Sequence, residues 1–232
     1  MTKITIAIDG LSSTGKSTIA KQLANELGYA YVDTGAMYRA VTLFAMQSGF
    51  FKGDKLNTKI LLKVLPNIQL KFVPNQKLGF AEMFLNGENV EQQIRTMEVS
   101  EKVSTIATVS EVRQFLVSQQ QKMGKDGGVV MDGRDIGTVV FPDAELKLYL
   151  TASDTKRATR RYRELLERGD DVTYEAVLKN VQHRDFIDST RDDSPLTKAE
   201  DAIAIDNSDM GLKEQSERIL SLAHHIIDKA SH

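Results

Sequence analysis

Cysteine is absent from this sequence of 232 residues, and so is tryptophan. Without cysteine the chain can form no disulfide, offers no thiolate nucleophile, and cannot bind zinc or an iron–sulfur cluster through sulfur. The histidines are too few and too badly spaced for a zinc site: His183, His224, His225 and His232. The chemistry of this protein must therefore depend on other side chains.

An excess of charge and long apolar segments are also missing. The 30 Lys and Arg residues nearly balance the 32 Asp and Glu residues, leaving a formal net charge of −2. A protein that coats nucleic acid is normally basic, so we expect no nucleic-acid partner. No stretch approaches the ~20 apolar residues of a membrane-spanning helix, and the N-terminal apolar run is too short for a signal core. We therefore expect no membrane association and a cytoplasmic location.

Five short apolar runs punctuate a composition that is 41% hydrophobic and 27% charged, as in a globular protein. Most of the runs are separated by helical patterns, and four are rich in β-branched or aromatic residues. They span residues 4–8, 29–32, 129–131, 146–150 and 202–205. This pattern predicts an α/β fold with a parallel sheet of five strands, buried under helices on both faces.

The first three runs each end in an aspartate followed by a turn: Asp9-Gly10, Asp33-Thr34-Gly35 and Asp132-Gly133. In open α/β sheets, ligands bind outside the carboxyl ends of the strands. A single aspartate there could merely cap the next helix. Three at matching positions favour a functional site at this edge of the sheet.

Residues 68–95 depart from this alternation of strands and helices. Residues 68–73 and 79–85 have a strand pattern, and Asn86-Gly87 suits a two-residue hairpin turn, so we predict a small antiparallel insertion. Residues 98–123 are predicted to form a long helical region. Residues 212–229 are predicted to form an amphipathic helix whose apolar stripe packs in the core.

A phosphate-binding loop follows the first predicted strand and opens a predicted helix. Its residues are Gly10, Leu11, Ser12, Ser13, Thr14, Gly15, Lys16, Ser17 and Thr18. The two glycines let the backbone curl so that N–H groups face phosphate oxygens. The lysine can then reach the β- and γ-phosphates, and the Ser17 hydroxyl can bind Mg²⁺. The pattern predicts a nucleoside triphosphate site.

Arginines are numerous, and they distinguish among the enzymes that use such a loop. No Asn-Lys-x-Asp tetrapeptide is present to read guanine, which argues against a GTPase. Arg157, Arg160 and Arg161 share one helix face, which either is solvated and balanced by nearby glutamates or holds an anion. Because Arg39 and Arg134 also follow predicted strands, we favour a basic cleft that faces the phosphate loop. Direct phosphoryl transfer between two anionic substrates needs such a cleft.

Several segments together resemble the bacterial cytidylate (CMP) kinases, which belong to the nucleoside monophosphate kinase family. These segments are residues 8–18, 33–39, 94–99, 131–143 and 184–191, and the most specific is Asp132-Gly133-Arg134-Asp135-Ile136-Gly137-Thr138. The resemblance covers nearly the full length. It implies a phosphate-loop kinase fold of five parallel strands, with a small antiparallel insertion and a lid.

The resemblance also implies roles for individual residues. Gly10 to Thr18 would cradle ATP and Mg²⁺, with Lys16 among the catalytic residues and Ser17 as a metal ligand. The phosphate of the monophosphate would be bound by Arg39, Arg134 and Arg191, beside Thr34 and Tyr38. Ser104, Arg113 and Asp135 would read cytosine. Arg184 and Asp188 would hold the sugar. Arg157 and Arg161, from the lid, would contact the transferring phosphoryl group.

The family further implies one kinase domain over residues 1–232. Its core would comprise residues 1–36, 96–156 and 172–232, its monophosphate-binding portion about 37–95, and its lid about 157–171. We expect a monomer that phosphorylates CMP and dCMP with ATP and Mg²⁺. The alternatives are a kinase for UMP, dTMP or AMP, and a nucleotide-hydrolysing switch. Asp192 and Asp193 depart from the family pattern: they could tether Arg191 in an open state or face solvent, and we favour the second.

Overall fold

The central sheet has five parallel strands, as the apolar runs predict. The computed structural model describes residues 3–231, so His232 and the two ends of the predicted core lie outside the described residues. The strands are β1 (Thr5–Gly10), β2 (Ala30–Asp33), β8 (Val129–Asp132), β9 (Leu146–Thr151) and β10 (Ile203–Asp206). Their order is β10-β9-β1-β8-β2, so all five carboxyl ends meet at one edge.

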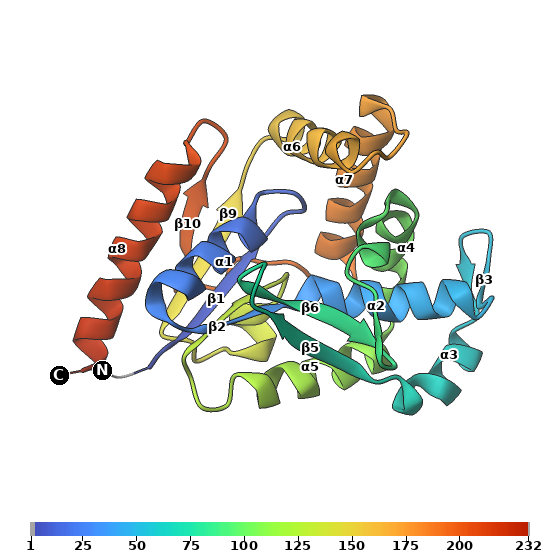
Figure 1. Ribbon diagram of the computed structural model, residues 1–232, viewed down its shortest axis with the longest axis horizontal. Coiled ribbons are helices and arrows are strands. Elements are labelled where there is room, and N and C mark those ends of the chain that lie inside the picture. The colour runs from blue at the N-terminus through green and yellow to red at the C-terminus, as the bar shows by residue number, and fades with distance from the viewer. Residues whose placement is uncertain (1–2, 232) are drawn as a thin grey trace.

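Helices cover both faces of this sheet (Figure 1). On one face, α1 (Lys16–Leu27) and α8 (Leu212–Ala230) bury Ile19 and Ile219 against Ile6 of β1. The helix predicted at residues 212–229 is therefore confirmed. The other face carries Val32 and Met131, covered by the π-helical turn Ile136–Val140 and by α5 (Ser110–Met123). Burial on both sides explains why β1, β8 and β9 have continuous apolar sequences, whereas β10, at the edge of the sheet, is mostly exposed.

A second apolar cluster lies beside the sheet, between α2 (Thr34–Gln47), α4 (Met97–Ala107), α5 and an antiparallel sheet. That sheet contains β5 (Leu70–Asn75), β6 (Phe80–Leu85) and β7 (Glu88–Asn89), so the predicted insertion is confirmed. Asn86 and Gly87 both have positive φ, 50° and 91°, as the predicted two-residue turn requires. This turn joins β6 to β7.

Three short elements between α2 and the insertion were not predicted. They are β3 (Phe51–Lys52), β4 (Lys55–Leu56) and α3 (Thr58–Val64). Strands of two residues leave no alternation to recognise in a sequence. The remaining short turns are two 3₁₀ helices, Leu65–Asn67 and Gln93–Arg95.

The helical region predicted at residues 98–123 consists of two helices rather than one. Helix α4 ends at Ala107 and α5 begins at Ser110, because Val109 has an extended backbone with ψ of 109°. The Arg113 guanidinium donates to the carbonyl of Ala107 at 3.3 Å, which satisfies one of the open groups at the end of α4. The break places Ser104 of α4 and Arg113 of α5 on the same pocket.

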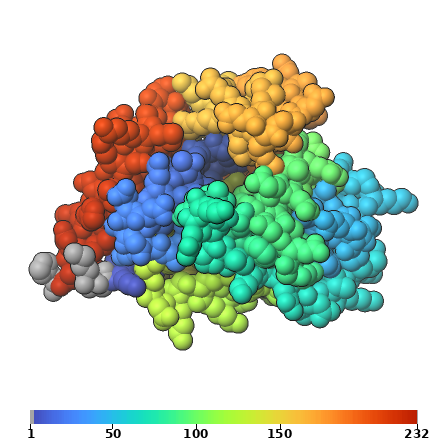
Figure 2. Space-filling view, in the orientation of Figure 1, coloured from blue at the N-terminus to red at the C-terminus, as the bar shows by residue number. Residues whose placement is uncertain are grey.

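Two helices form an arm over the carboxyl edge of the sheet, α6 (Asp154–Glu167) and α7 (Tyr174–Thr190) (Figure 1). They pack against each other, and α7 also packs against α4. In the space-filling view, a hollow lies between this arm, α1 and the insertion (Figure 2). Within residues 3–231, no helix has the length and apolar character needed to cross a membrane.

Candidate active site

The phosphate loop joins β1 to α1 at the carboxyl edge of the sheet. Gly10 has φ of 143°, and a Cβ at this position would lie 2.0 Å from the carbonyl oxygen of Leu150 in β9. Gly15 has φ of 90° and occupies the N-cap of α1, where no side chain binds the first N–H groups. The loop therefore passes close to the sheet and leaves the positive end of α1 open to an anion.

Lys16 is folded back onto this loop. Its Nζ donates to the carbonyls of Gly10 at 3.0 Å and Leu11 at 2.6 Å, and its side chain is buried. Burial, together with the nearby Arg134, lowers the pKa of Lys16 to about 7. Asp132, Asp185 and Asp9 raise this pKa only in part, and none of the salt bridges among residues 3–231 involves Lys16. A phosphate group entering the loop would supply a direct anionic partner and would stabilise the charged form.

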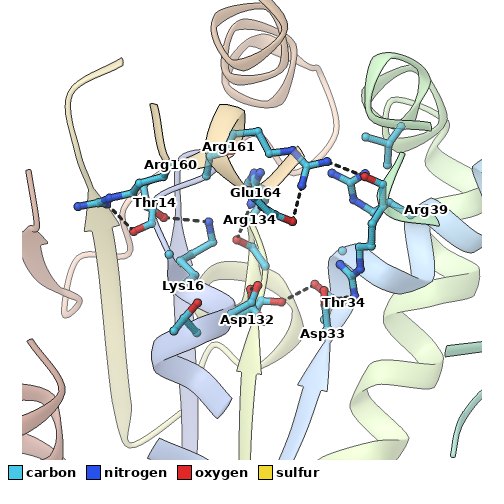
Figure 3. Close-up of a pocket in the computed structure, with 18 of the residues that line it drawn as sticks. Thr14, Lys16, Asp33, Thr34, Arg39, Asp132, Arg134, Arg160, Arg161 and Glu164 are labelled. Atoms are coloured by element: carbon cyan, nitrogen blue, oxygen red, sulfur yellow. Dashed lines mark hydrogen bonds and ion pairs between the residues drawn. The ribbon is translucent and has the colours of Figure 1, made fainter. Parts of the chain in front are cut away.

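Asp132, at the end of β8, closes the site beneath the loop (Figure 3). Its carboxylate accepts from Ser17 Oγ at 3.0 Å and from Tyr31 Oη at 2.8 Å. Burial, followed by repulsion from Asp33, raises the pKa of Asp132 to about 6. Burial acts in the same direction on Asp33, but the guanidinium of Arg95, 2.8 Å from Oδ2, outweighs it and lowers the pKa of Asp33.

The oxygen atoms of Ser17 and Asp132 suit magnesium. Mg²⁺ favours oxygen ligands, keeps several waters, and is usually bound by one or two carboxylates together with substrate phosphates. A hydroxyl and a carboxylate 3.0 Å apart at the mouth of a phosphate loop match that requirement. Within residues 3–231, no cluster of three or more His, Cys, Asp or Glu offers a separate metal site.

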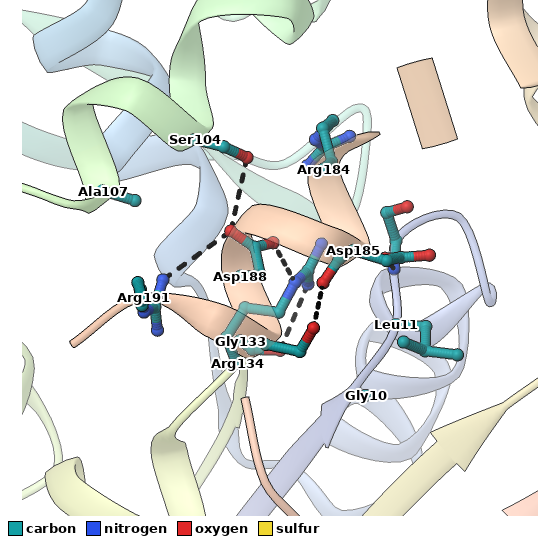
Figure 4. Close-up of polar contacts among 12 residues, drawn as sticks. Gly10, Leu11, Ser104, Ala107, Gly133, Arg134, Arg184, Asp185, Asp188 and Arg191 are labelled. Atoms are coloured by element: carbon teal, nitrogen blue, oxygen red, sulfur yellow. Dashed lines mark hydrogen bonds and ion pairs between the residues drawn. The ribbon is translucent and has the colours of Figure 1, made fainter. Parts of the chain in front are cut away.

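A second group of charged residues lies on the other side of the pocket, around Asp188 of α7 (Figure 4). Asp188 accepts from Arg134 Nε at 2.9 Å and from Ser104 Oγ at 3.3 Å, and Arg191 Nη1 is 3.7 Å away. Burial works against the Asp188 carboxylate, but the surrounding arginines outweigh it and lower its pKa. One carboxylate thus fixes side chains from the turn after β8, from α4 and from the C-cap of α7 at a single point.

Arg113 and Asp135 form a buried ion pair next to this group. The guanidinium of Arg113 lies 5.7 Å from the ring centroid of Tyr38, and Arg113 Nε and Tyr38 Oη are both buried without a hydrogen-bond partner. Asp193 Oδ1 lies 3.9 Å from Arg113 Nε, and its side chain is half-buried. The prediction that Asp193 faces solvent is therefore wrong, whereas Asp192 is exposed as predicted.

Positive charge exceeds negative charge in the centre of the pocket. Burial lowers the pKa of Arg39, Arg184 and Arg191, and neighbouring arginines lower each of them further; for Arg184 the pKa falls to about 10. Among the residues that the structure describes, the Arg39 side chain donates only to the carbonyl of Ile94, at 3.2 Å. Arginines that repel one another in a buried site are stabilised by an anion between them, so this centre is built to bind one.

The arginines of α6 point in different directions. Arg161 lines the pocket and donates to Glu164 Oε1 at 2.6 Å and to the carbonyl of Arg95 at 2.7 Å. Arg160 contacts the phosphate loop at the carbonyl of Thr14, 3.1 Å away (Figure 3). Arg157 does not reach the pocket, because its guanidinium is paired with Asp154 and Asp185 behind the loop.

One cavity of about 790 Å³ brings nearly all of the predicted site residues together. The predicted residues that line it are Ser13, Thr14, Gly15, Lys16, Ser17, Thr18, Thr34, Tyr38, Arg39, Ser104, Arg113, Arg134, Asp135, Arg161, Arg184, Asp188 and Arg191. Gly10, Leu11, Ser12 and Arg157 are not among its lining residues. Thr34 Oγ1 donates to the carbonyl of Asp132 at 2.7 Å, so its hydroxyl holds the strand end.

Other lining residues received no role from the sequence. Asp33, Arg95, Asp132 and Arg160 carried a signal, either as strand-end aspartates or as members of the arginine set. Lys21 and Phe80 carried none: they meet across the pocket mouth, with Lys21 Nζ 3.5 Å from the ring centroid of Phe80. Their contact joins α1 to β6, and no local pattern links residues in such distant elements.

Comparison with known proteins agrees with this arrangement. The family model described as "Cytidylate kinase" matches residues 6–225. The chain is 63% identical to a cytidylate kinase of Flavobacterium johnsoniae over 227 residues, which cover 98% of this chain and 99% of the relative. It is 60% identical to the cytidylate kinase of Flavobacterium psychrophilum, with 97% and 100% covered. For the cytidylate kinase of Parabacteroides distasonis the identity is 56%, with 98% and 99% covered.

These matches run through the phosphate loop, the strand-end aspartates and the arginine-rich pocket that the fold brings together. The chain belongs to the cytidylate kinase family.

Proposed function

We propose that this protein transfers the γ-phosphoryl group of ATP to CMP and dCMP, forming ADP and the corresponding diphosphates. One observation carries this proposal beyond family membership. A phosphate loop and a separate set of buried arginines face each other across a single cavity, so two phosphorylated molecules can bind head to head. A nucleotide-hydrolysing switch would need only the first of these sites. The many second-site arginines therefore favour a kinase.

The phosphate of the monophosphate is assigned to Arg39, Arg134 and Arg191. Their guanidinium groups suit bidentate contact with phosphate oxygens. Arg39 and Arg191 have pKa values lowered by burial and by neighbouring arginines, so a bound phosphate would stabilise their charged forms. Thr34 and Tyr38 border the same part of the cavity.

Recognition of cytosine is assigned to Ser104, Arg113 and Asp135. A carboxylate can accept from the exocyclic amine of cytosine, while donors face its N3 and O2 atoms. Uracil presents the opposite pattern at these positions, and a mismatched buried polar group costs about 1–3 kcal/mol. The unpartnered Nε of Arg113 supplies one such donor. Arg184 and Asp188 are assigned to the sugar.

Phosphoryl transfer between these sites requires positioning and charge stabilisation rather than covalent chemistry. Lys16, Arg134 and Arg161 line the cavity between the two sites and would stabilise the negative charge that moves during transfer. Ser17 and Asp132 would hold Mg²⁺, which when bound neutralises phosphate charge and aligns the oxygens. We also propose that Arg157 contributes to the use of ATP. Because its guanidinium lies behind the phosphate loop, it would do so through the loop.

We assign these sites to one kinase domain. In this assignment the core comprises residues 1–36, 96–156 and 172–232, residues 37–95 bind the monophosphate, and residues 157–171 form the lid. Because ATP and CMP are cytoplasmic metabolites, we place the reaction in the cytoplasm, and we expect the enzyme to act as a monomer.

The test is a coupled assay of ADP release with ATP, Mg²⁺ and one acceptor at a time. The acceptors are CMP, dCMP, UMP, dTMP, AMP and GMP, with a reaction lacking an acceptor as the control. We expect CMP and dCMP to give the highest kcat/KM. A higher value for UMP, dTMP or AMP would replace cytidylate as the substrate. Equal rates without an acceptor would make the protein a nucleotide hydrolase.

A further inference from the structure

Ser12, in the middle of the phosphate loop, is held from the side that faces away from the cavity. Its backbone N–H donates to Asp185 Oδ1 at 2.8 Å, and its carbonyl accepts from Arg157 Nη1 at 3.0 Å. Its hydroxyl donates to the carbonyl of Val181 at 3.4 Å, and its side chain is fully buried. Asp185, Arg157 and Val181 do not line the cavity. The arm formed by α6 and α7 therefore binds the loop on the side opposite the cavity.

Arg157 and Asp185 also hold each other. Arg157 Nη1 pairs with Asp185 Oδ2, Nη2 pairs with Asp154, and Nε donates to the carbonyl of Ala152 at 2.9 Å. All three nitrogens of the guanidinium are thus occupied, and Arg157 is only 1% exposed. In Figure 4, Asp185 extends from α7 toward the part of the loop that contains Gly10 and Leu11. Because its guanidinium is fully paired, Arg157 interacts with the phosphate loop.

The geometry of the peptide bond explains how these contacts behind the loop can affect ATP binding. The peptide bonds of the described chain are trans, so the carbonyl of one residue and the N–H of the next point in opposite directions. With the Ser12 carbonyl turned toward Arg157, the Ser13 N–H is turned toward the cavity. The Thr14 carbonyl accepts from Arg160 at 3.1 Å and from Asn207 Nδ2 at 2.7 Å, and both of these residues line the cavity.

We infer that Asp185 and Arg157 are positioning residues for ATP: together they hold the Ser12–Ser13 peptide so that its N–H group is preset for a phosphate oxygen. This inference rests on the proposed function, since it describes how the same kinase binds its phosphoryl donor. It also gives Arg157 a role that differs from direct contact with the transferring phosphoryl group. The arginine acts through the loop, and Asp185 holds the arginine in place.

The test measures ATP binding by titration calorimetry with Mg²⁺ and without CMP. Asp185→Ala removes both the acceptor for Ser12 and the partner of Arg157, and we expect about tenfold weaker ATP binding. CMP binding, measured alone, should change by less than about threefold, because the Asp185 carboxylate is bonded to Ser12 and Arg157 and acts on the arginines assigned to CMP only over a longer range. At saturating ATP, kcat should stay within about threefold of wild type. Glu175→Gln, at an exposed acid on the same helix, is the matched control.

Asp185→Asn keeps an acceptor for Ser12 and removes only the charge, so it replaces the alanine variant if that protein fails to fold. Arg157→Gln removes the other charge of the pair. If the two residues act as a unit, a variant substituted at both Asp185 and Arg157 binds ATP no more weakly than the single variant with the lower ATP affinity. Independent, additive losses would overturn the inference.

Two further results would also overturn it. One is wild-type ATP affinity in both Asp185 variants. The other is an Arg157→Gln protein that binds ATP normally but loses kcat by about a hundredfold or more, as expected for a residue that touches the phosphoryl group. Failure of the wild-type protein to phosphorylate CMP would contradict only the proposed function, because the affinities for ATP are measured without an acceptor.

Discussion

Arg134 stands where the two substrates would meet. It follows the end of β8, its Nε lies 2.9 Å from Asp188, and it lines the cavity between the phosphate loop and the second arginine group. We predict that Arg134→Ala lowers kcat by about a hundredfold or more, because a preset charge next to the moving phosphoryl group is lost. ATP binding, measured by calorimetry, should change by less than about threefold. A loss of ATP affinity as large as the loss of turnover would place Arg134 at the other substrate.

Asp132 lies opposite Ser17 at the proposed metal site, but burial and the nearby Asp33 disfavour its charged form. Its folded-state pKa of about 6 lies above the ordinary value of 3.8, so the folded protein favours the protonated acid. The stabilisation that comes from this proton is present at low pH and is lost as the pH rises through about 6. At pH 8 the wild-type protein therefore contains a buried, charged carboxylate, which lowers the free energy of unfolding. An asparagine at this position would carry no charge and would not have this effect.

We predict that Asp132→Asn unfolds at a higher temperature than wild type at pH 8, with a gain of roughly 1–3 kcal/mol that shrinks toward pH 5. The same variant should lose about a hundredfold or more in kcat, because the carboxylate opposite Ser17 is gone. Thermal melts without nucleotide at the two pH values, together with the coupled assay, check both parts. A variant less stable than wild type at pH 8 would mean that the neighbouring side chains stabilise the carboxylate.

The phosphate-loop motif, the strand-end residues and the resemblance to the cytidylate kinases together predicted most of the cavity lining, from Ser13 to Arg191. The position of Arg157 could not be predicted in this way. It shares a helix face with Arg160 and Arg161, and spacing along a helix does not show which member of a set meets the loop and which meets the cavity. Which arginine contacts the phosphate loop depends on which turn of α6 lies next to the loop in the folded protein. The carboxylates of the exposed Asp154 and the partly buried Asp185 then pair with Arg157 away from the cavity.

Among the elements, the tip of the β5–β6 hairpin has the most specific contact with the core. Phe80 begins β6, and its ring centroid lies 3.5 Å from Lys21 Nζ of α1. Cation–π contacts contribute about 0.5–2 kcal/mol. This contact therefore holds the insertion against the mouth of the cavity, on the side that we assign to the monophosphate.

We predict that Phe80→Leu, which keeps an apolar side chain but removes the ring, raises KM for CMP by about threefold to tenfold. KM for ATP should change by less than about twofold, because the phosphate loop does not touch the hairpin. Steady-state kinetics with each substrate varied in turn measure both effects. Lys77→Ala, at an exposed position of the same tip, serves as the control. An equal rise in both KM values would show that the hairpin supports the whole site instead.

The long elements of the fold were predictable, and the short or interrupted ones were not. Strands β1, β8 and β9 are buried on both faces and so form apolar runs that stand out in the sequence. The break between α4 and α5 has no proline or glycine to mark it; Thr108 and Val109 separate the helices, and the side chain of Arg113 satisfies a carbonyl across the gap. That contact is tertiary, so a local pattern cannot reveal it.

At the scale of the whole molecule, we predict a monomer. An apolar groove between α1 and α8 includes Leu212, which is 59% exposed, but its rim carries the charged residues Glu26, Lys213 and Glu217. Sedimentation equilibrium over a range of concentrations should fit a single species of 25.9 kDa. A mass that doubles as the concentration rises would contradict the prediction, and Leu212→Glu would then test whether this groove is the interface.

The order of the strands also has a consequence for how the protein is made. β1 is synthesised before the other strands of its sheet, yet its neighbours there are β8, which begins at Val129, and β9, which begins at Leu146. Its apolar residues, Ile6 and Ile8 among them, therefore have no strand partner until more than half of the chain has been synthesised. Pairing between such distant segments is slow. Until then, the strand that supports the phosphate loop is exposed to aggregation and to chaperones.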